Sequence, residues 1–235
     1  MNNNEIKYKG NVILKNSTLS LGYKGISMIL SLISSPLLLN ILGNYKYGVY
    51  TSALSIVSWI YYFDLGIGNG LRFKVTEFIA KSDYDSARKT VTVSYIMVSV
   101  VMMFLVIIIG ILSLFFDTTS FFGIEIKSEN LNVILLISII LASINFVFSL
   151  VNNILLATQE SSKVNFFSLL GQVFFIIGLI FYIKWGISLI IMISFAEGGA
   201  QFLKNIIETI YVFNRHPKLK PGRGYVDFYY SKGIM

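Results

Sequence analysis

Long, uninterrupted apolar stretches are the feature that most constrains how this chain can fold. A helix needs roughly 20 apolar residues to cross about 30 Å of hydrocarbon, and six stretches of the sequence approach that length. These runs lack the amphipathic spacing of helices on a soluble protein. They predict an all-α, polytopic transmembrane bundle with about six spans at residues 17–42, 47–71, 91–116, 131–157, 165–183 and 187–213.

The composition supports a lipid environment and excludes several classes of site. Hydrophobic residues make up 55% of the 235 positions and charged residues only 13%, about half the charged fraction of an ordinary soluble domain. The net charge of +7 could suggest a nucleic-acid ligand, but the basic residues fall between the apolar runs, so we expect no nucleic acid as a partner. Because the chain has no cysteine and a single histidine, His216, we expect neither a metal site nor redox chemistry.

The basic residues also predict how the spans are oriented. Thirteen lie on one side of the six expected spans: Lys7, Lys9, Lys15, Arg72, Lys74, Lys81, Arg88, Lys89, Lys163, Arg215, Lys218, Lys220 and Arg223. Three lie on the other side: Lys46, Lys127 and Lys184. Since Lys and Arg are enriched in cytoplasmic loops, this bias places both termini in the cytoplasm.

Three regions follow from this pattern: a cytoplasmic N-terminus at residues 1–16, a six-span transmembrane region at 17–213 and a linker from 214 to 235. Apolar residues in the 72–90 connection recur at near-helical intervals, which favours a helix along the cytoplasmic interface, although a solvated loop is the alternative. Prolines and glycines break any helix after Phe213. The sequence VDFYYSKGIM then resembles the start of another helical element, so we interpret the chain as a truncated product.

The first expected span carries a polar stripe that includes Lys24. Its other members recur at steps of three and four residues and share one helical face: Ser17, Ser20, Ser27, Ser31 and Ser34. A charge inside a membrane usually faces a cavity or a partner, but the serines suit close helix contacts equally well. Lys24 lies about seven residues, or about 10 Å, inside the span, so it is either a cavity cation or a side chain that reaches back to the interface.

The sixth expected span carries a second polar stripe. Glu197, Gln201, Lys204 and Glu208 fall within about 40° of one another at 100° per residue, so they share a face. Lys204 could pair with Glu208 at the i,i+4 spacing or share a layer with Lys24. Glu197, near the middle of the membrane, is a candidate site for a coupling ion, although it could instead pair with Lys24 or be protonated.

The fourth expected span places Ser138, Asn145, Ser149 and Asn152 on one face. Asn145 and Asn152 could bind sugar hydroxyls in a cavity, but amides of this kind also form hydrogen bonds between helices. The GIGNG sequence after Asp64 lacks the strand context of a phosphate-binding loop, and we interpret it as a bend at the end of a helix.

Two segments are similar to a known family. Residues 63–95, FDLGIGNGLRFKVTEFIAKSDYDSARKTVTVSY, resemble the second-to-third helix region of Wzx-like O-antigen flippases and related polysaccharide exporters of the MOP (MATE-like) superfamily. Residues 35–54, SPLLLNILGNYKYGVYTSAL, resemble the first loop of that family. Members usually have two six-helix lobes, and this sequence matches the first lobe and a few residues of the second.

The resemblance implies a transporter and not an enzyme. The implied activity is the movement of an undecaprenyl-pyrophosphate-linked oligosaccharide across the bacterial cytoplasmic membrane by alternating access, with no cofactor. The expected partners are this lipid-linked sugar, the bilayer and either a second lobe or polysaccharide assembly proteins. Lys24, and with less support Lys204, would match the cationic cavity of the family. The alternatives are a cation-coupled multidrug exporter of the same superfamily and a fragment that is inactive alone.

Overall fold

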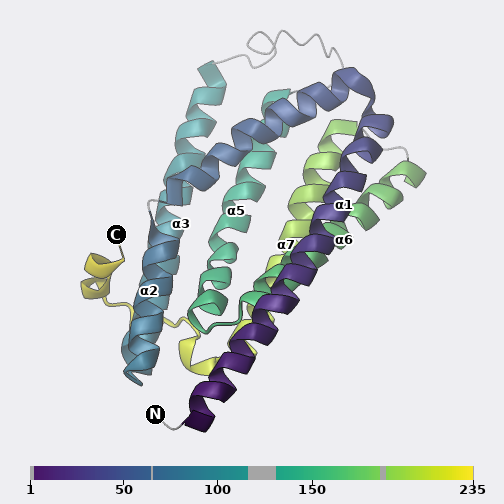
Figure 1. The fold of residues 1–235 in the computed structure, drawn as a ribbon. Helices are drawn as coiled ribbons and strands as arrows, with labels where there is room; N and C mark the ends of the chain where they lie inside the picture. The colour runs from purple at the N-terminus through teal and green to yellow at the C-terminus, as the bar shows by residue number, and fades with distance from the viewer. Residues whose placement is uncertain (1–2, 65, 116–130, 186–188, 235) are drawn as a thin grey trace.

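The computed structural model describes residues 3–64, 66–115, 131–185 and 189–234, and all the regular structure in these ranges is helical. The expectation of an all-α bundle is therefore confirmed (Figure 1). The long helices are α1 (Asn3–Ser58), α2 (Ile67–Ala80), α3 (Tyr84–Phe115), α5 (Leu131–Ala157), α6 (Ser161–Trp185) and α7 (Leu189–Arg215).

The first expected span ends at a bend inside α1. Gly43 has a φ of 71° and a ψ of 165°, which are not helical values. A residue with a side chain rarely adopts such a positive φ, whereas glycine does so readily. The helix therefore turns after Leu42, as the sequence predicted, and its second part crosses back over the bundle (Figure 1).

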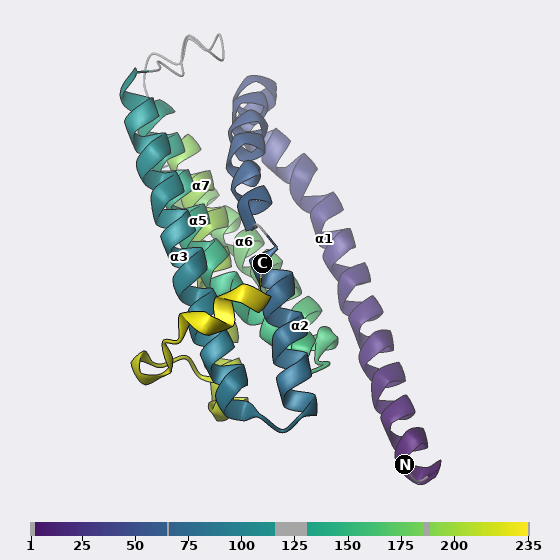
Figure 2. The same ribbon diagram turned by 90° about the vertical axis from the view of Figure 1, so that its left-hand side faces the viewer.

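The second expected span is divided. After Ser58 the chain forms a 3₁₀ turn, η1 (Trp59–Asp64), and α2 begins after Gly66, which has a φ of 78°. The glycines of GIGNG thus provide the expected bend. Part of the 72–90 connection is helical, since α2 extends to Ala80, so the alternative of a solvated loop does not hold there. Helices α2 and α3 run alongside each other (Figures 1 and 2). The reason is that Leu71 and Val75 are fully buried in the core.

Four helical segments in the described residues are long and apolar enough to cross a membrane: Leu14–Ser52, Tyr84–Phe115, Leu135–Ala157 and Ser161–Phe181. The first of them includes the Gly43 bend, so it covers the first expected span and part of the second. The part of α7 with described side chains, residues 197–215, is not among the four, and it carries Glu197, Lys204 and Glu208. The side chains of α7 before Glu197 lie outside the described residues.

The exposed side chains of α3 are those expected of a surface in contact with lipid. Its outward face repeats large apolar residues that are each more than half exposed: Val100, Met103, Phe104, Ile107, Ile111 and Leu114. On the opposite face, Val91, Val98 and Met102 are buried in the core with residues of α5 such as Val151 and Ile154. A surface this apolar is stable when it faces hydrocarbon and not water.

One end of the bundle holds the α2–α3 turn at residues 81–83, the α5–α6 turn at 158–160 and the end of α7; we call it the basal end (Figure 1). Most of the thirteen basic residues counted above lie in or near these turns, whereas Lys46 lies near the Gly43 bend at the other end. Lys127 falls outside the described residues. The alternation of the helices thus brings together the basic residues that the sequence analysis placed on one side.

Residues 217–234, which we call the C-terminal segment, fold back from α7 across α3 to α2 (Figure 2). The segment contains three 3₁₀ turns: η2 (Pro217–Leu219), η3 (Arg223–Tyr225) and η4 (Phe228–Gly233). The guanidinium of Arg88 lies 3.8 Å from the ring centroid of Tyr225, and its Nε donates a hydrogen bond of 2.6 Å to the carbonyl of Lys220. The expected linker is therefore ordered against the bundle.

Candidate functional site

A hydrogen bond joins the second part of α1 to α7 inside the bundle. The hydroxyl of Tyr50 donates to Oε2 of Glu197, and Tyr50 is buried. The bend at Gly43 makes this contact possible, since it turns the second part of α1 back over α7. Glu197 therefore has a tyrosine as its partner, and the alternative of a Glu197–Lys24 ion pair is not found.

Glu197 lines a cavity of about 260 Å³ between α1, α5 and α7. Leu54, Val57, Leu141 and Ala142 supply most of its apolar wall. The polar side chains on the wall come from all three helices: Ser58, Ser138, Asn145, Glu197 and Gln201. A mostly apolar pocket with a few converging polar groups is the usual form of a small-molecule site, so this cavity is the candidate functional site.

Asn145 has two roles in the structure. It lines the cavity, and its Nδ2 donates a hydrogen bond of 3.0 Å to the carbonyl of Gly198 on α7. Its Oδ1 accepts a hydrogen bond of 3.1 Å from Asn205. One donor and one acceptor of its side-chain amide are thus used in joining α5 to α7, which is the packing alternative raised from the sequence.

Lys204 and Glu208 form an ion pair of 2.9 Å, with their side chains 8% and 0% exposed. Nζ of Lys204 also donates a hydrogen bond of 2.8 Å to Asn205. The i,i+4 interpretation of these two residues therefore agrees with the structure, and the cation of Lys204 is neutralised beside the cavity instead of facing it. Since a buried charge is costly without a partner, the pair accounts for both charges.

The serines of α1 contact α6. Oγ of Ser27 donates a 2.8 Å hydrogen bond to Gln172, which in turn donates a 2.8 Å bond to Ser31. Asn165 donates to Ser20. The serine stripe thus joins two helices, whereas the side chain of Lys24, between Ser20 and Ser27, is exposed.

Asn152 does not line the cavity. Its Nδ2 donates a 3.0 Å hydrogen bond to the carbonyl of Ser149, one turn earlier on α5. The polar face expected on the fourth span is therefore divided between the cavity, which Ser138 and Asn145 reach, and local contacts near the basal end.

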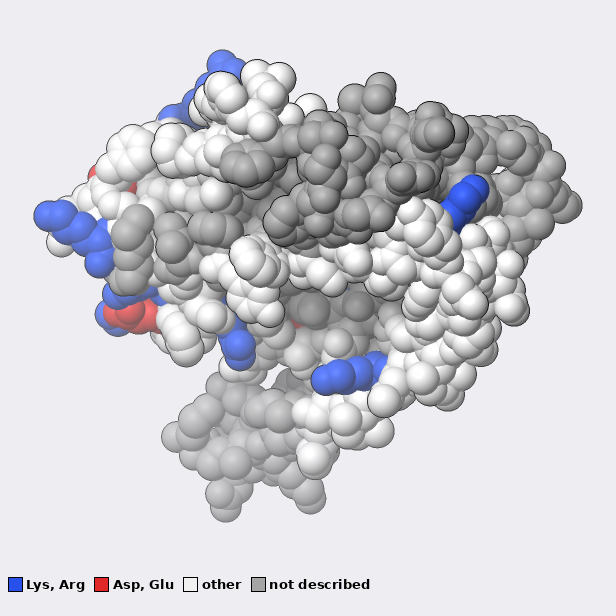
Figure 3. Space-filling model, turned by 90° about the horizontal axis from the view of Figure 1, so that it is seen from above, with Lys and Arg blue, Asp and Glu red and all other residues white. Residues whose placement is uncertain are grey.

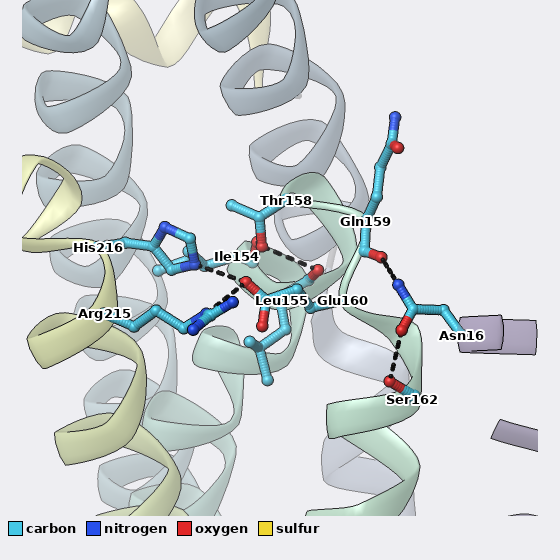
Figure 4. Close-up of polar contacts among 9 residues, drawn as sticks. All are labelled: Asn16, Ile154, Leu155, Thr158, Gln159, Glu160, Ser162, Arg215 and His216. Carbon is cyan, nitrogen blue, oxygen red and sulfur yellow. Dashed lines mark hydrogen bonds and ion pairs between the residues drawn. The ribbon is translucent and has the colours of Figure 1, made fainter. Parts of the chain in front are cut away.

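A second cluster of polar contacts, at the basal end, was not predicted from the sequence (Figure 4). Oε1 of Glu160 accepts a 3.0 Å hydrogen bond from Arg215 and lies 2.8 Å from Nε2 of His216, so it joins the α5–α6 turn to the end of α7. Hydrogen bonding to Glu160 raises the pKa of Arg215 above its usual value. On the other side of the turn, Asn16 donates to the carbonyl of Gln159 and accepts from Ser162.

Sequence reasoning missed Tyr50 and Glu160 as partners of charged groups. A tyrosine within an apolar helix is a signal that could have been used, since a buried tyrosine hydroxyl usually finds a hydrogen-bonding partner. Glu160 carries no such signal, because its partners lie 55 and 56 residues further along the chain.

The fold is similar to that of a solved transporter. A structure described as the outward-facing conformation of a multidrug resistance MATE family transporter of the MOP superfamily matches with a TM-score of 0.67 and 14% sequence identity. The match covers 94% of this chain and 49% of that chain, so this chain spans about half the length of that transporter. No curated protein matches the sequence.

These features define a multi-helical membrane protein whose fold is similar to one lobe of a MOP-superfamily transporter. A family model described as polysaccharide biosynthesis protein matches residues 13–232. The chain therefore belongs to this polysaccharide biosynthesis protein family, and the resemblance found in the sequence is confirmed.

Proposed function

We propose that this chain forms the six-helix lobe of a flippase that moves an undecaprenyl-pyrophosphate-linked oligosaccharide across the bacterial cytoplasmic membrane. Alternating access of a cavity to the two leaflets would let the charged head and the sugars cross while the lipid tail remains in the bilayer. A second lobe would complete the transport path, with the regions 1–16 and 214–235 on the cytoplasmic side. The family match supports the link to polysaccharides.

The cavity between α1, α5 and α7 is the observation that carries this proposal. Its wall presents a carboxylate, two amides and two hydroxyls within a bundle whose outer faces are apolar. Sugar hydroxyls both donate and accept hydrogen bonds, so mixed amide and hydroxyl groups suit them. Moving such a head group past these polar groups lowers the cost of exposing it to hydrocarbon.

Lys24 is the better of the two proposed pyrophosphate ligands. The ammonium of Lys204 is held by Glu208, whereas the side chain of Lys24 is exposed on α1. A lysine acts as a point charge toward phosphate oxygens. Glu197 is the proposed site for a coupling ion, since it lies on the cavity wall.

Complementation tests this function. The complete protein with Lys24→Ala should fail to restore surface polysaccharide in cells that lack the flippase, while Lys15→Ala, which removes an exposed cation near the basal end of the same helix, should restore it. Membrane levels of both variants are measured by immunoblotting. Normal polysaccharide from Lys24→Ala would remove this residue from the mechanism.

A second candidate function is cation-coupled drug export, which the Glu197 carboxylate on the cavity wall and the fold match favour. In that case Glu197→Gln should abolish drug resistance conferred by the complete protein, and Lys24→Ala should not. Loss of polysaccharide without any change in drug resistance would exclude the exporter.

A further inference from the structure

A cavity outside the transport site opens between the C-terminal segment and the α2–α3 pair. It measures about 420 Å³ and lies near the basal end. Residues from α2, α3 and η4 line it: Lys74, Glu77, Phe78, Thr90, Tyr229, Tyr230 and Lys232. The proposed flippase mechanism uses none of these residues.

Contacts between the C-terminal segment and the bundle fix the shape of this cavity. The hydroxyl of Tyr230 lies 2.9 Å from Oγ of Ser86, and its ring meets Phe78 edge-on at 5.9 Å. Ile234 is 2% exposed and lies against Gly70, where an added Cβ would overlap its backbone. The cavity is therefore built by a defined close approach of η4 to α2.

The charge in and around this cavity is positive. Glu77 accepts hydrogen bonds of 3.1 Å from Lys74 and 2.7 Å from Lys81, so two ammonium groups share one carboxylate. Lys232 lines the cavity from η4 and forms no ion pair with any residue in the described ranges. An anion between Lys74 and Lys232 would meet two cations and a carboxylate that is already bonded twice.

The surroundings of the cavity suit a lipid more than a soluble anion. Tyr229 on its wall is 75% exposed, and tyrosine is enriched at the membrane interface. Phe73 and Phe228, each next in sequence to a lining residue, are 71% and 59% exposed. Further along α3, the exposed apolar face begins at Val100. Seen from above, charged side chains gather mainly on the side where α2, α3 and the C-terminal segment lie (Figure 3).

We propose that this cavity binds the phosphate head group of an anionic phospholipid, with Lys74 and Lys232 as its cationic ligands and the acyl chains along α3. Tyr229 and Phe78 supply the aromatic walls. Basic residues near a membrane surface each contribute about 1 kcal/mol to attraction toward anionic lipid, which corresponds to about fivefold in affinity. The two lysines together should therefore raise the affinity for anionic lipid about 25-fold.

The test uses the complete protein in nanodiscs of neutral phosphatidylcholine with increasing phosphatidylglycerol. Binding is measured by the retention of phosphatidylglycerol after delipidation and by native mass spectrometry. The wild type should retain phosphatidylglycerol over phosphatidylcholine, and the Lys74→Ala/Lys232→Ala variant should lose about 25-fold of this preference. The Lys46→Ala variant, which removes an exposed cation at the opposite end, should keep it.

Two results would overturn the proposal: equal retention of the two lipids by the wild type, or an unchanged preference in the double lysine variant. Displacement of the lipid by millimolar inorganic phosphate would assign the site to a soluble anion instead. Melting curves show whether the variants are folded. Since Lys24 and Glu197 lie elsewhere, failure of the flippase proposal would leave this result unaffected.

Discussion

The hydroxyl of Tyr50 donates a hydrogen bond to the carboxylate of Glu197, and this contact joins the part of α1 beyond Gly43 to α7. It forms beside the cavity that the two helices share with α5. Any movement that separates the second part of α1 from α7 must break this bond. The pair therefore links Glu197 on the cavity wall to the part of α1 beyond Gly43.

Substitution of either partner should weaken the α1–α7 contact. Tyr50→Phe keeps the ring but removes the donor, and Glu197→Gln removes the charge. Hydrogen bonds between membrane helices contribute on the order of 1 kcal/mol, so each variant should lose about this much stability. In a double-mutant cycle measured by thermal unfolding in detergent, the double variant should lose less stability than the sum of the two single losses. Strictly additive losses would contradict a direct interaction.

Substitution of one member of the Lys204–Glu208 ion pair should lower the stability of the protein far more than substitution of both members. Lys204→Met leaves a fully buried carboxylate without its cation, and removal of one partner of a buried pair costs about 3–5 kcal/mol. Lys204→Met/Glu208→Leu removes both charges and should recover most of the loss. Unfolding measured by intrinsic fluorescence checks this; a double variant as unstable as the single one would contradict it.

Much of the fold could be predicted from the sequence, because lipid imposes a simple rule of long apolar helices. The end of a span at Leu42 and the grouping of the basic residues were predicted on that basis, whereas the bend at GIGNG was predicted from its glycines. The path of α2 was not predicted. An amphipathic pattern shows which face of a helix is buried, but it does not show whether that face packs against a membrane or against a neighbouring helix. Here that face, which includes Leu71 and Val75, is part of the core.

Gly70→Ala should detach the end of the C-terminal segment. The new Cβ would overlap the backbone of Ile234, so η4 must move away from α2. Limited trypsin digestion should then cut faster at Lys232, which is detected by mass spectrometry. Gly48→Ala is the matched control, because a Cβ at Gly48 meets no atom within 4 Å. Equal digestion of Gly70→Ala and the wild type would show that the segment is not held at this point.

Asp83 should make stability depend on pH at the basal end. Its Oδ1 accepts a 3.0 Å hydrogen bond from the backbone N–H of Ser86 at the start of α3, and hydrogen bonding to Ser86 lowers the pKa of Asp83 below its usual 3.8. A lowered carboxyl pKa stabilises the folded state above the unfolded pKa, and this contribution is lost as the pH falls through the folded pKa.

The matched variants are Asp83→Ala and Asp83→Asn. The alanine variant should be less stable than the wild type at pH 7, with the difference shrinking toward pH 3, because protonation weakens the cap in the wild type. Asparagine caps a helix without a charge, so it should keep most of the stability and lose the pH dependence. If the stability difference between Asp83→Ala and the wild type stayed constant from pH 7 to pH 3, the role of the Asp83 carboxylate as a helix cap would be contradicted.

The candidate site was predictable in part. The polar faces of α5 and α7 follow from helical spacing, and Ser138, Asn145, Glu197 and Gln201 do converge on the cavity. Helical spacing alone could not show whether a polar residue lines the cavity or packs against another helix. Lys204, for example, forms an ion pair with Glu208 on its own helix. Tyr50 required the bend at Gly43 to be placed in three dimensions, because it lies 147 residues from Glu197 in the chain.

Translocation in vesicles tests the central claim most directly. The complete protein is reconstituted with a fluorescent undecaprenyl-pyrophosphate-linked oligosaccharide, and the fraction reaching the opposite leaflet is followed by quenching. Ala142→Phe places a ring in the cavity wall of α5, whereas Ile140→Phe enlarges an exposed side chain on the same helix. The account predicts rapid translocation by the wild type and by Ile140→Phe, and a rate no higher than that of protein-free vesicles for a folded Ala142→Phe protein. Wild-type activity in the Ala142→Phe protein, or no translocation by the wild type, would contradict it.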